Sequence, residues 1–121
     1  MILHRIKETL ESFGYEVEVN GKIKGLSGVV HDFDVLARKG ETTIGVIIGN
    51  DDFHLSYVVG IVKAIDVKDT CVILLVEKKY AELDVKSSKN FHLLIYESPV
   101  DLEGKLKELI GVCENSSEKH E

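Results

Sequence analysis

Apolar side chains in the first third of the chain change from helical spacing to strand spacing. Apolar residues three or four positions apart predict a helix over residues 2–13, closed by Gly14. The alternation Tyr-Glu-Val-Glu-Val over 15–19 predicts a half-buried strand, and Asn20-Gly21 predicts a turn. A second extended segment covers 29–38. This part of the chain therefore predicts one helix followed by antiparallel strands.

The rest of the chain alternates strands with helices. The β-branched run 42–48 and the apolar runs 71–76 and 91–96 predict buried strands. Between them, residues 53–65 predict a helix covering the sheet, and 80–86 a short helix. The helical spacing within 53–65 comes from Leu55, Val58, Val59, Val62 and Ile65.

A last helix begins at Pro99 and carries one apolar face of leucine and isoleucine. The element order is α-β-β-β-α-β-α-β-α, which predicts an α/β fold with a central mixed sheet. The opening meander should be antiparallel and the later β-α-β crossovers parallel and right-handed. We expect a single domain over 1–113 and a polar, disordered tail over 114–121.

Composition narrows the class of protein. The chain has 121 residues and a formal net charge of −6, which argues against a protein that coats nucleic acid non-specifically. Its longest apolar run is too short to cross a bilayer, and its start lacks the features of a signal peptide, so we expect a cytoplasmic protein without a membrane partner. The reducing cytoplasm argues against a disulfide between Cys71 and Cys113.

One stretch carries a family resemblance. It reads Lys-Gly-Leu-Ser-Gly-Val-Val-His-Asp-Phe-Asp-Val-Leu-Ala over 24–37, a glycine-containing lead-in to Asp34 that is followed by a hairpin and a buried strand. This arrangement resembles the restriction-endonuclease-like PD-(D/E)xK superfamily, and more narrowly its archaeal and Mrr-like branch. The resemblance implies that Asp34 is a ligand of Mg²⁺ and that the next strand carries an acid, one spacer and a lysine.

The second half of that motif is replaced. Aligned on the strand, Ile47 stands where the acid belongs and Gly49 where the lysine belongs. Neither side chain can bind a hard cation or offer a proton. We therefore expect Asp34 to be a vestigial catalytic residue, Ile47 to be buried, and the chain to need no cofactor.

Migrated residues would give an active alternative, a Mg²⁺-dependent DNA endonuclease. Its metal ligands would come from five carboxylates, namely Asp34, Asp51, Asp52, Glu8 and Glu11. Lys39 or Lys63 would replace the missing lysine. The competing interpretation makes Asp51 and Asp52 helix N-terminal charges, and Glu8 and Glu11 a solvated helix face. Strand alternation places Asp32 and Asp34 on one face, opposite Phe33 and Val35.

Binding without catalysis is the function that the sequence favours, with nucleic acid or a protein as partner. The nucleic-acid candidates are five residues around the predicted hairpin, Lys22, Lys24, Ser27, Arg38 and Lys39. The second alternative is a structural protein that assembles as a homodimer, because a small α/β domain often hides a helix face or sheet edge in a symmetric contact.

Overall fold

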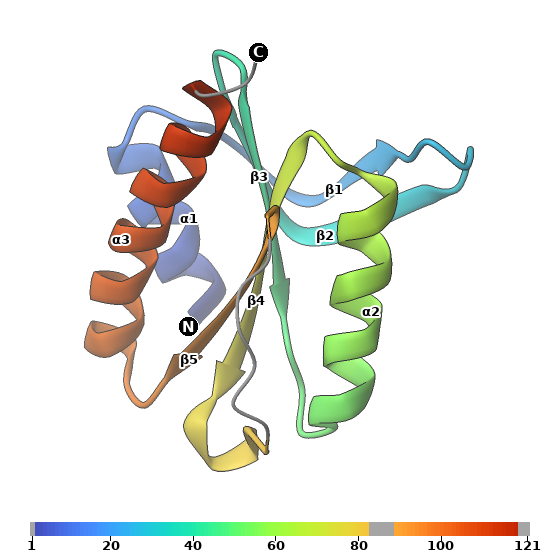
Figure 1. Cartoon of the computed structure of the whole chain (residues 1–121). Helices are drawn as coiled ribbons and strands as arrows, with labels where there is room; N and C mark the ends of the chain where they lie inside the picture. Colours follow the sequence, from blue (N-terminus) through green and yellow to red (C-terminus); the bar gives the residue numbers. More distant parts are fainter. Residues whose placement is uncertain (1, 83–88, 119–121) are drawn as a thin grey trace.

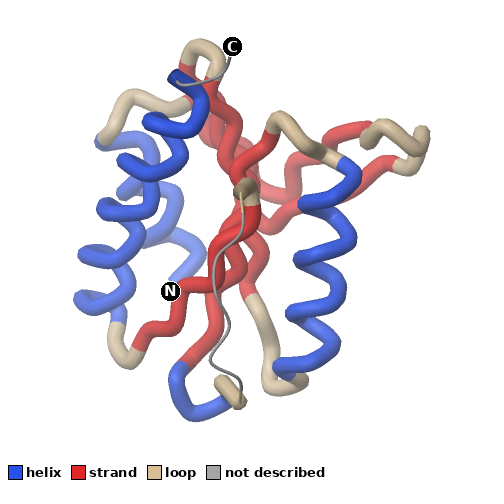
Figure 2. Tube along the Cα trace, in the orientation of Figure 1, coloured by secondary structure: helices blue, strands red, loops and turns tan. Residues whose placement is uncertain are grey.

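A computed structural model describes residues 2–82 and 89–118 and shows a five-stranded sheet with helices on both faces (Figure 1, Figure 2). The strands lie in the order β1-β2-β3-β4-β5. The elements are α1 Ile2–Ser12, β1 Glu16–Lys24, β2 Val30–Lys39, β3 Thr42–Ile48, α2 Phe53–Asp66, β4 Thr70–Glu77, the 3₁₀ turn η1 Lys78–Tyr80, β5 Phe91–Tyr96 and α3 Pro99–Glu118.

The pairing confirms the predicted mixed α/β sheet. β1, β2 and β3 form an antiparallel meander, whereas β3, β4 and β5 pair in parallel, with α2 in the connection between β3 and β4. β4 lies between two parallel neighbours, and seven of its eight residues are buried. Burial on both faces explains why this strand is apolar at nearly every position. No helix in the described part of the chain is long and apolar enough to cross a membrane.

Two hydrophobic clusters lie on opposite faces of the sheet. One joins α1 and α3 to the sheet and includes Leu10, Val35 and Leu106. The other lies beneath α2 and includes Phe53 and Phe91. Figure 1 shows the same division, with α1 and α3 on one side of the strands and α2 on the other.

The helix α2 packs on the sheet through small residues. Its buried positions are Phe53, Ser56, Gly60 and Ala64, largely a four-residue repeat. A Cβ on Gly60 would lie 2.6 Å from the Phe91 ring, so only glycine lets the helix approach β5 this closely. The stripe by which the sequence predicts this helix is therefore not the stripe that packs on the sheet.

Two local predictions differ from the structure. Asn20-Gly21 lies inside β1 and does not end it; Asn20 adopts φ 58°, and the pairing register with β2 is the same on either side of it. Of the helix predicted over 80–86, the structure describes only the first three residues: Tyr80 ends the 3₁₀ turn Lys78–Tyr80, and Ala81 and Glu82 are not helical. Residues 83–88 lie outside the described part of the chain.

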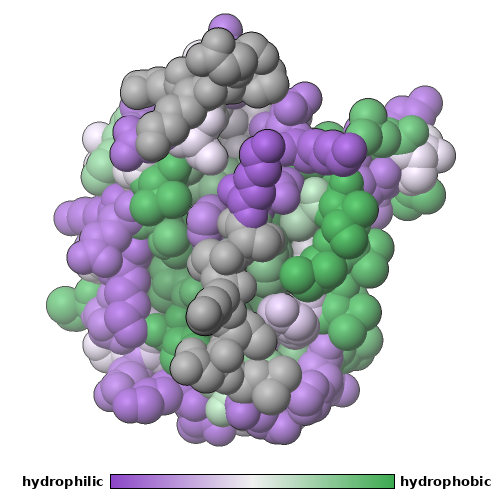
Figure 3. Space-filling view, in the orientation of Figure 1, coloured by the Kyte–Doolittle hydropathy of each residue, from purple (hydrophilic) through white to green (hydrophobic). Residues whose placement is uncertain are grey.

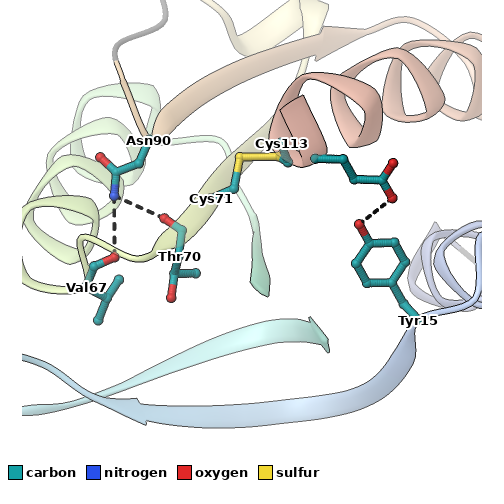
Figure 4. Close-up of a disulfide and its surroundings, with 7 residues drawn as sticks. Tyr15, Val67, Thr70, Cys71, Asn90 and Cys113 are labelled. Atoms are coloured by element: carbon teal, nitrogen blue, oxygen red, sulfur yellow. Dashed lines mark hydrogen bonds between the residues drawn. A yellow bond between two sulfur atoms is a disulfide. The ribbon is translucent and has the colours of Figure 1, made fainter. Parts of the chain in front are cut away.

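The expectation of two separate cysteines is wrong. Cys71 on β4 and Cys113 on α3 form a disulfide, with their Cα atoms 5.8 Å apart (Figure 4). The two residues face each other because α3 packs back across the sheet next to β4, an approach that sequence separation does not reveal.

The helix α3 also continues through Glu118, into the segment expected to be a tail. Glu114 explains this extension, since it accepts a hydrogen bond from the Tyr15 hydroxyl at 2.7 Å and pairs with Lys39 at 2.9 Å. These contacts lower the pKa of Glu114, with the hydrogen bond from Lys39 as the largest cause. Burial raises the pKa of Tyr15 above its ordinary value.

Candidate functional site

Asp34 lies where β2 separates from β3. The last paired residues of these strands are Val35 and Val46, and beyond them the Ile48 N–H has no strand partner on this side. The Asp34 carboxylate accepts that N–H at 2.6 Å. The side chain thus replaces a backbone carbonyl at the end of the ladder, and the half-buried residue is held in the plane of the sheet.

A local twist of β2 accounts for this orientation. Phe33 belongs to the cluster beneath α2, whereas Val35, two residues later, belongs to the cluster beneath α1 and α3. Regular alternation would put Phe33 and Val35 on the same face of the strand. The prediction that they share a face, opposite Asp34, is therefore wrong. Asn20, opposite Asp34 in the register, carries the left-handed backbone at the same level of β1.

Ile47 and Gly49, which stand at the replaced motif positions, are both packed against neighbouring residues. Ile47 is 8% exposed and lies in the cluster beneath α2, which confirms that it is buried. The Gly49 N–H donates to the Leu75 carbonyl at 2.7 Å, and a Cβ on Gly49 would lie 2.8 Å from the same oxygen. The backbone therefore leaves no room for a side chain at position 49.

The five candidate metal ligands do not converge. Glu8 pairs with His4 at 3.0 Å and Glu11 with Lys7 at 2.9 Å, both along α1. Asp52 caps α2 by accepting the Leu55 N–H at 3.0 Å, and Asp51 is exposed beside it. Within residues 2–82 and 89–118, no group of three or more His, Cys, Asp or Glu side chains could hold a metal ion. The five carboxylates therefore do not form one shared metal site in the described residues.

The Asp34 hydrogen bond gives a stability prediction. Asp34→Ala should lower the free energy of unfolding by about 1–3 kcal/mol, because a partly buried N–H loses its acceptor. Asp34→Asn keeps an acceptor oxygen and should lose less than half as much. Urea unfolding of the three proteins measures the difference. Equal losses in the two variants would show that the Ile48 N–H does not depend on this side chain.

The candidate nucleic-acid residues lie at two ends of the β1–β2 hairpin. Lys22 and Lys24 pair in register with Asp32 and Val30 near the turn, and both are exposed. Arg38 and Lys39 lie at the opposite end, where Lys39 donates to the Phe13 carbonyl at 2.9 Å. 

Arg38 and Lys39 each lie beside an acidic side chain. Arg38 lies 3.9 Å from Glu18, and Lys39 pairs with Glu114. Ser27 donates its hydroxyl to Asp66 at 2.6 Å. The structure therefore does not bring these five residues into one basic surface.

The most distinctive surface lies on the outer side of α2. Leu55, Val58, Val62 and Ile65 are 55%, 56%, 53% and 65% exposed, and Val59 beside them is 36% exposed. The spacing of these residues predicts the helix correctly. The sequence pattern did not show that their side chains point to solvent and not to the sheet. A signal was available: an apolar helix with a second, small-residue stripe can pack by that stripe and leave the larger one outside.

The turn between β1 and β2 extends this surface. Leu26 is 75% exposed, and Val29 and Val30 are each 55% exposed. Figure 3 shows apolar residues in green over α2 and over this hairpin turn. Val30 pairs with Lys24 on the face of the hairpin opposite to His31, which contacts Asp66 of α2, so Val30 is not part of this surface. The other seven residues are called the apolar face below: Leu26, Val29, Leu55, Val58, Val59, Val62 and Ile65.

Asp66 fixes the turn to the end of α2. Its carboxylate accepts the Ser27 N–H at 2.8 Å as well as the Ser27 hydroxyl, and it lies 2.7 Å from His31 Nε2. Its carbonyl accepts the Leu26 N–H at 3.0 Å. The hydrogen bonds from Ser27, with a smaller effect of His31, lower the pKa of Asp66 to about 2. A Cβ on Gly25 would overlap this carboxylate, so glycine is required for the close approach.

The two charged residues of α2, Lys63 and Asp66, are bound to the β1–β2 hairpin. Lys63 donates to the Asp32 carbonyl, lies 3.6 Å from the Asp32 carboxylate and sits over the Phe33 ring at 5.3 Å. The charge of Lys63 is the largest cause that lowers the pKa of Asp32. Asp66 faces Ser27 and His31, and His54 at the first turn pairs with Glu82 at 3.0 Å. The stripe from Leu55 to Ile65 is therefore apolar along its length, and the exposed His54–Glu82 pair borders it at the first turn of α2.

A cavity of about 310 Å³ opens beside the disulfide on another side of the molecule, lined by Lys68, Lys89, Asn90 and both cysteines among others. The Asn90 side-chain amide donates to the Val67 and Thr70 carbonyls at 3.4 and 3.0 Å (Figure 4), and to the Ala64 carbonyl at 2.9 Å. It thereby joins the end of α2 to the start of β4. His92, on β5, is buried, and its burial lowers its pKa.

Comparisons with known proteins give little beyond this geometry. No protein-family model matches the chain, and no curated protein matches it. Among solved structures, the chain is similar to the crystal structure of the protein of unknown function AF1548, at 14% identity and a TM-score of 0.44. The alignment covers 91% of this chain and 54% of that one, so the chain spans about half the length of that protein.

Proposed function

We propose that this chain is a non-catalytic, nuclease-like domain that functions by binding a protein through its apolar face. The observation that carries the proposal is the exposed, uncharged stripe on α2, whose four main members are each more than half exposed. A helix that is apolar on both sides is typical of one that is covered on both sides. The sheet covers only one side of α2 here.

The size of the apolar face supports a protein partner. Monomeric soluble proteins seldom expose a contiguous apolar patch larger than about 300–600 Å². From their exposed fractions, the seven residues together expose about 650 Å², somewhat less than the ~800 Å² that each partner contributes to an interface of standard size. Depletion of charge at the centre is also the compositional feature of interface cores.

The nuclease motif supports the non-catalytic part of the proposal. Asp34 accepts a backbone N–H, Ile47 is buried under α2, and Gly49 lies against the β4 backbone. The candidate basic residues, in turn, are divided between two ends of the hairpin. A protein partner therefore fits the described surface better than a nucleic acid does.

Photo-crosslinking in the expressing cell tests the proposal. A benzophenone amino acid replacing Val58 should give one discrete protein adduct, whose partner peptide is then identified by mass spectrometry. The matched control places the same group at Lys107, an exposed position on α3. Absence of an adduct at Val58, or the same adducts from Lys107, would contradict binding through the apolar face.

A further inference from the structure

The spacing on the outer side of α2 is that of a helix–helix seam. Leu55, Val58, Val62 and Ile65 follow one another at intervals of three, four and three residues. This is the a/d spacing by which two helices interlock at a small crossing angle. Val59 widens the seam on one side. A partner that presents an equivalent helix would fill the spaces between these side chains.

A second copy of the chain supplies such a helix. In a two-fold contact, each residue of the surface meets the symmetry-related surface, so one self-complementary patch serves both partners. The seam meets this condition because it carries no charge that would face its own copy across the axis. Lys63 and Asp66, the residues that would repel a copy, are already bound to Asp32 and Ser27.

The hairpin turn sets the direction of the second helix. Asp66 holds Leu26 and its neighbours beside the carboxyl end of α2, so the apolar face is wide at that end and narrow at Leu55. In an antiparallel pair, the wide end of each copy covers the narrow end of the other. A parallel pair would place the two turns at one end and leave both Leu55 side chains without cover. The dipoles of the two helices also favour the antiparallel pair.

We propose that the partner of the apolar face is a second copy of this chain, in an antiparallel, two-fold α2–α2 contact capped at each end by the β1–β2 turn. This inference rests on the proposed protein-binding function and names its partner. Complete cover of the face in both copies would bury at most about 1,300 Å² in total, which lies at the lower end of the range of interfaces of standard size.

Sedimentation of the purified protein measures the assembly. Sedimentation equilibrium of the wild-type protein should give twice the 13.5 kDa mass of one chain. Val62→Lys should weaken self-association at least about a hundredfold, because the two-fold places the buried lysine at two symmetric sites. Val112→Lys is the matched control, since Val112 is 45% exposed on α3, and it should remain dimeric. Far-ultraviolet circular dichroism confirms that both variants are folded.

Crosslinking measures the direction. Leu55→Cys protein mixed with Ile65→Cys protein should form a mixed disulfide under mild oxidation, whereas an antiparallel pair should form few links between two Leu55→Cys chains. Preferential Leu55–Leu55 linkage would overturn the antiparallel arrangement. A wild-type monomer, or a Val62→Lys protein that stays dimeric, would overturn the second copy as the partner. If the purified chain is monomeric but Val58 still crosslinks to an identified protein in the cell, the proposed function stands and this inference fails.

Discussion

Restoring the nuclease motif with Ile47→Glu and Gly49→Lys is expected to unfold the protein and not to create a nuclease. Ile47 is 8% exposed beneath α2, where a carboxylate would lose its hydration among aromatic and aliphatic side chains. An uncompensated buried charge costs about 3–5 kcal/mol. A lysine at position 49 would place its Cβ 2.8 Å from the Leu75 carbonyl oxygen, which belongs to rigid β4 backbone. The combined loss is a large part of the 5–15 kcal/mol typical of a domain.

Single variants separate the two effects. Ile47→Glu should be less destabilised at pH 5 than at pH 8, because burial raises the pKa of a carboxyl and favours its neutral form. Ile47→Leu keeps the volume and should cost less than about 1.5 kcal/mol. Urea unfolding measures each loss, with thermal melts in the presence and absence of Mg²⁺.

The opposite outcome has a clear signature. If the new carboxylate and Asp34 formed a metal site, Mg²⁺ would raise the melting temperature of Ile47→Glu in proportion to its binding. Cleavage of supercoiled or branched DNA by that variant, or by the wild-type chain with an inactive Asp34→Ala control, would overturn the non-catalytic proposal. We expect neither protein to cleave DNA in Mg²⁺ or Mn²⁺.

The main elements of the fold follow from local patterns. The strands of the parallel half are apolar runs, and the run 71–76 lies in β4, which neighbouring strands cover on both edges and helices cover on both faces. The helices α1 and α3 each have one apolar stripe, so that Leu10, Leu106 and Ile110 could face only the core. The prediction that Ile47 is buried succeeds for the same reason. An element with a single apolar stripe or run can pack in only one way, so its buried face can be predicted from the sequence.

The sequence failed where two interpretations compete. In α2 the larger stripe looks like the packing face, but Gly60 and Ala64 allow a closer approach to the sheet than Val58 or Val62 would. At Asp34 the two-residue period fails because the strand twists, and the residue that signals the twist, Asn20, is typical of a turn. The face by which α2 packs and the twist of β2 both depend on tertiary packing. The sequence pattern therefore did not identify the outer face of α2 as an exposed surface.

Breaking the disulfide between Cys71 and Cys113 is expected to cause the second large loss of stability. The cysteines are 42 residues apart in sequence, and closing a loop of this length in the unfolded chain is worth about 4 kcal/mol in the chain-entropy account. The bond also joins β4 to the part of α3 that carries Glu114, whose contacts with Tyr15 and Lys39 anchor the end of the helix. Reduction should therefore lower the global stability and also loosen the last turns of α3.

Guanidinium unfolding with and without dithiothreitol tests this role. The midpoint for the wild-type chain should fall on reduction, and the double variant Cys71→Ala, Cys113→Ala should start low and show no response to the reductant. Hydrogen exchange should rise most over 111–118, because this segment loses its covalent anchor to β4 while α1 and the sheet remain packed around Leu10 and Val35. An unchanged midpoint in a sample with two titratable thiols would show that packing alone holds α3 on the sheet. A response of the double variant to dithiothreitol would show that the reductant acts elsewhere.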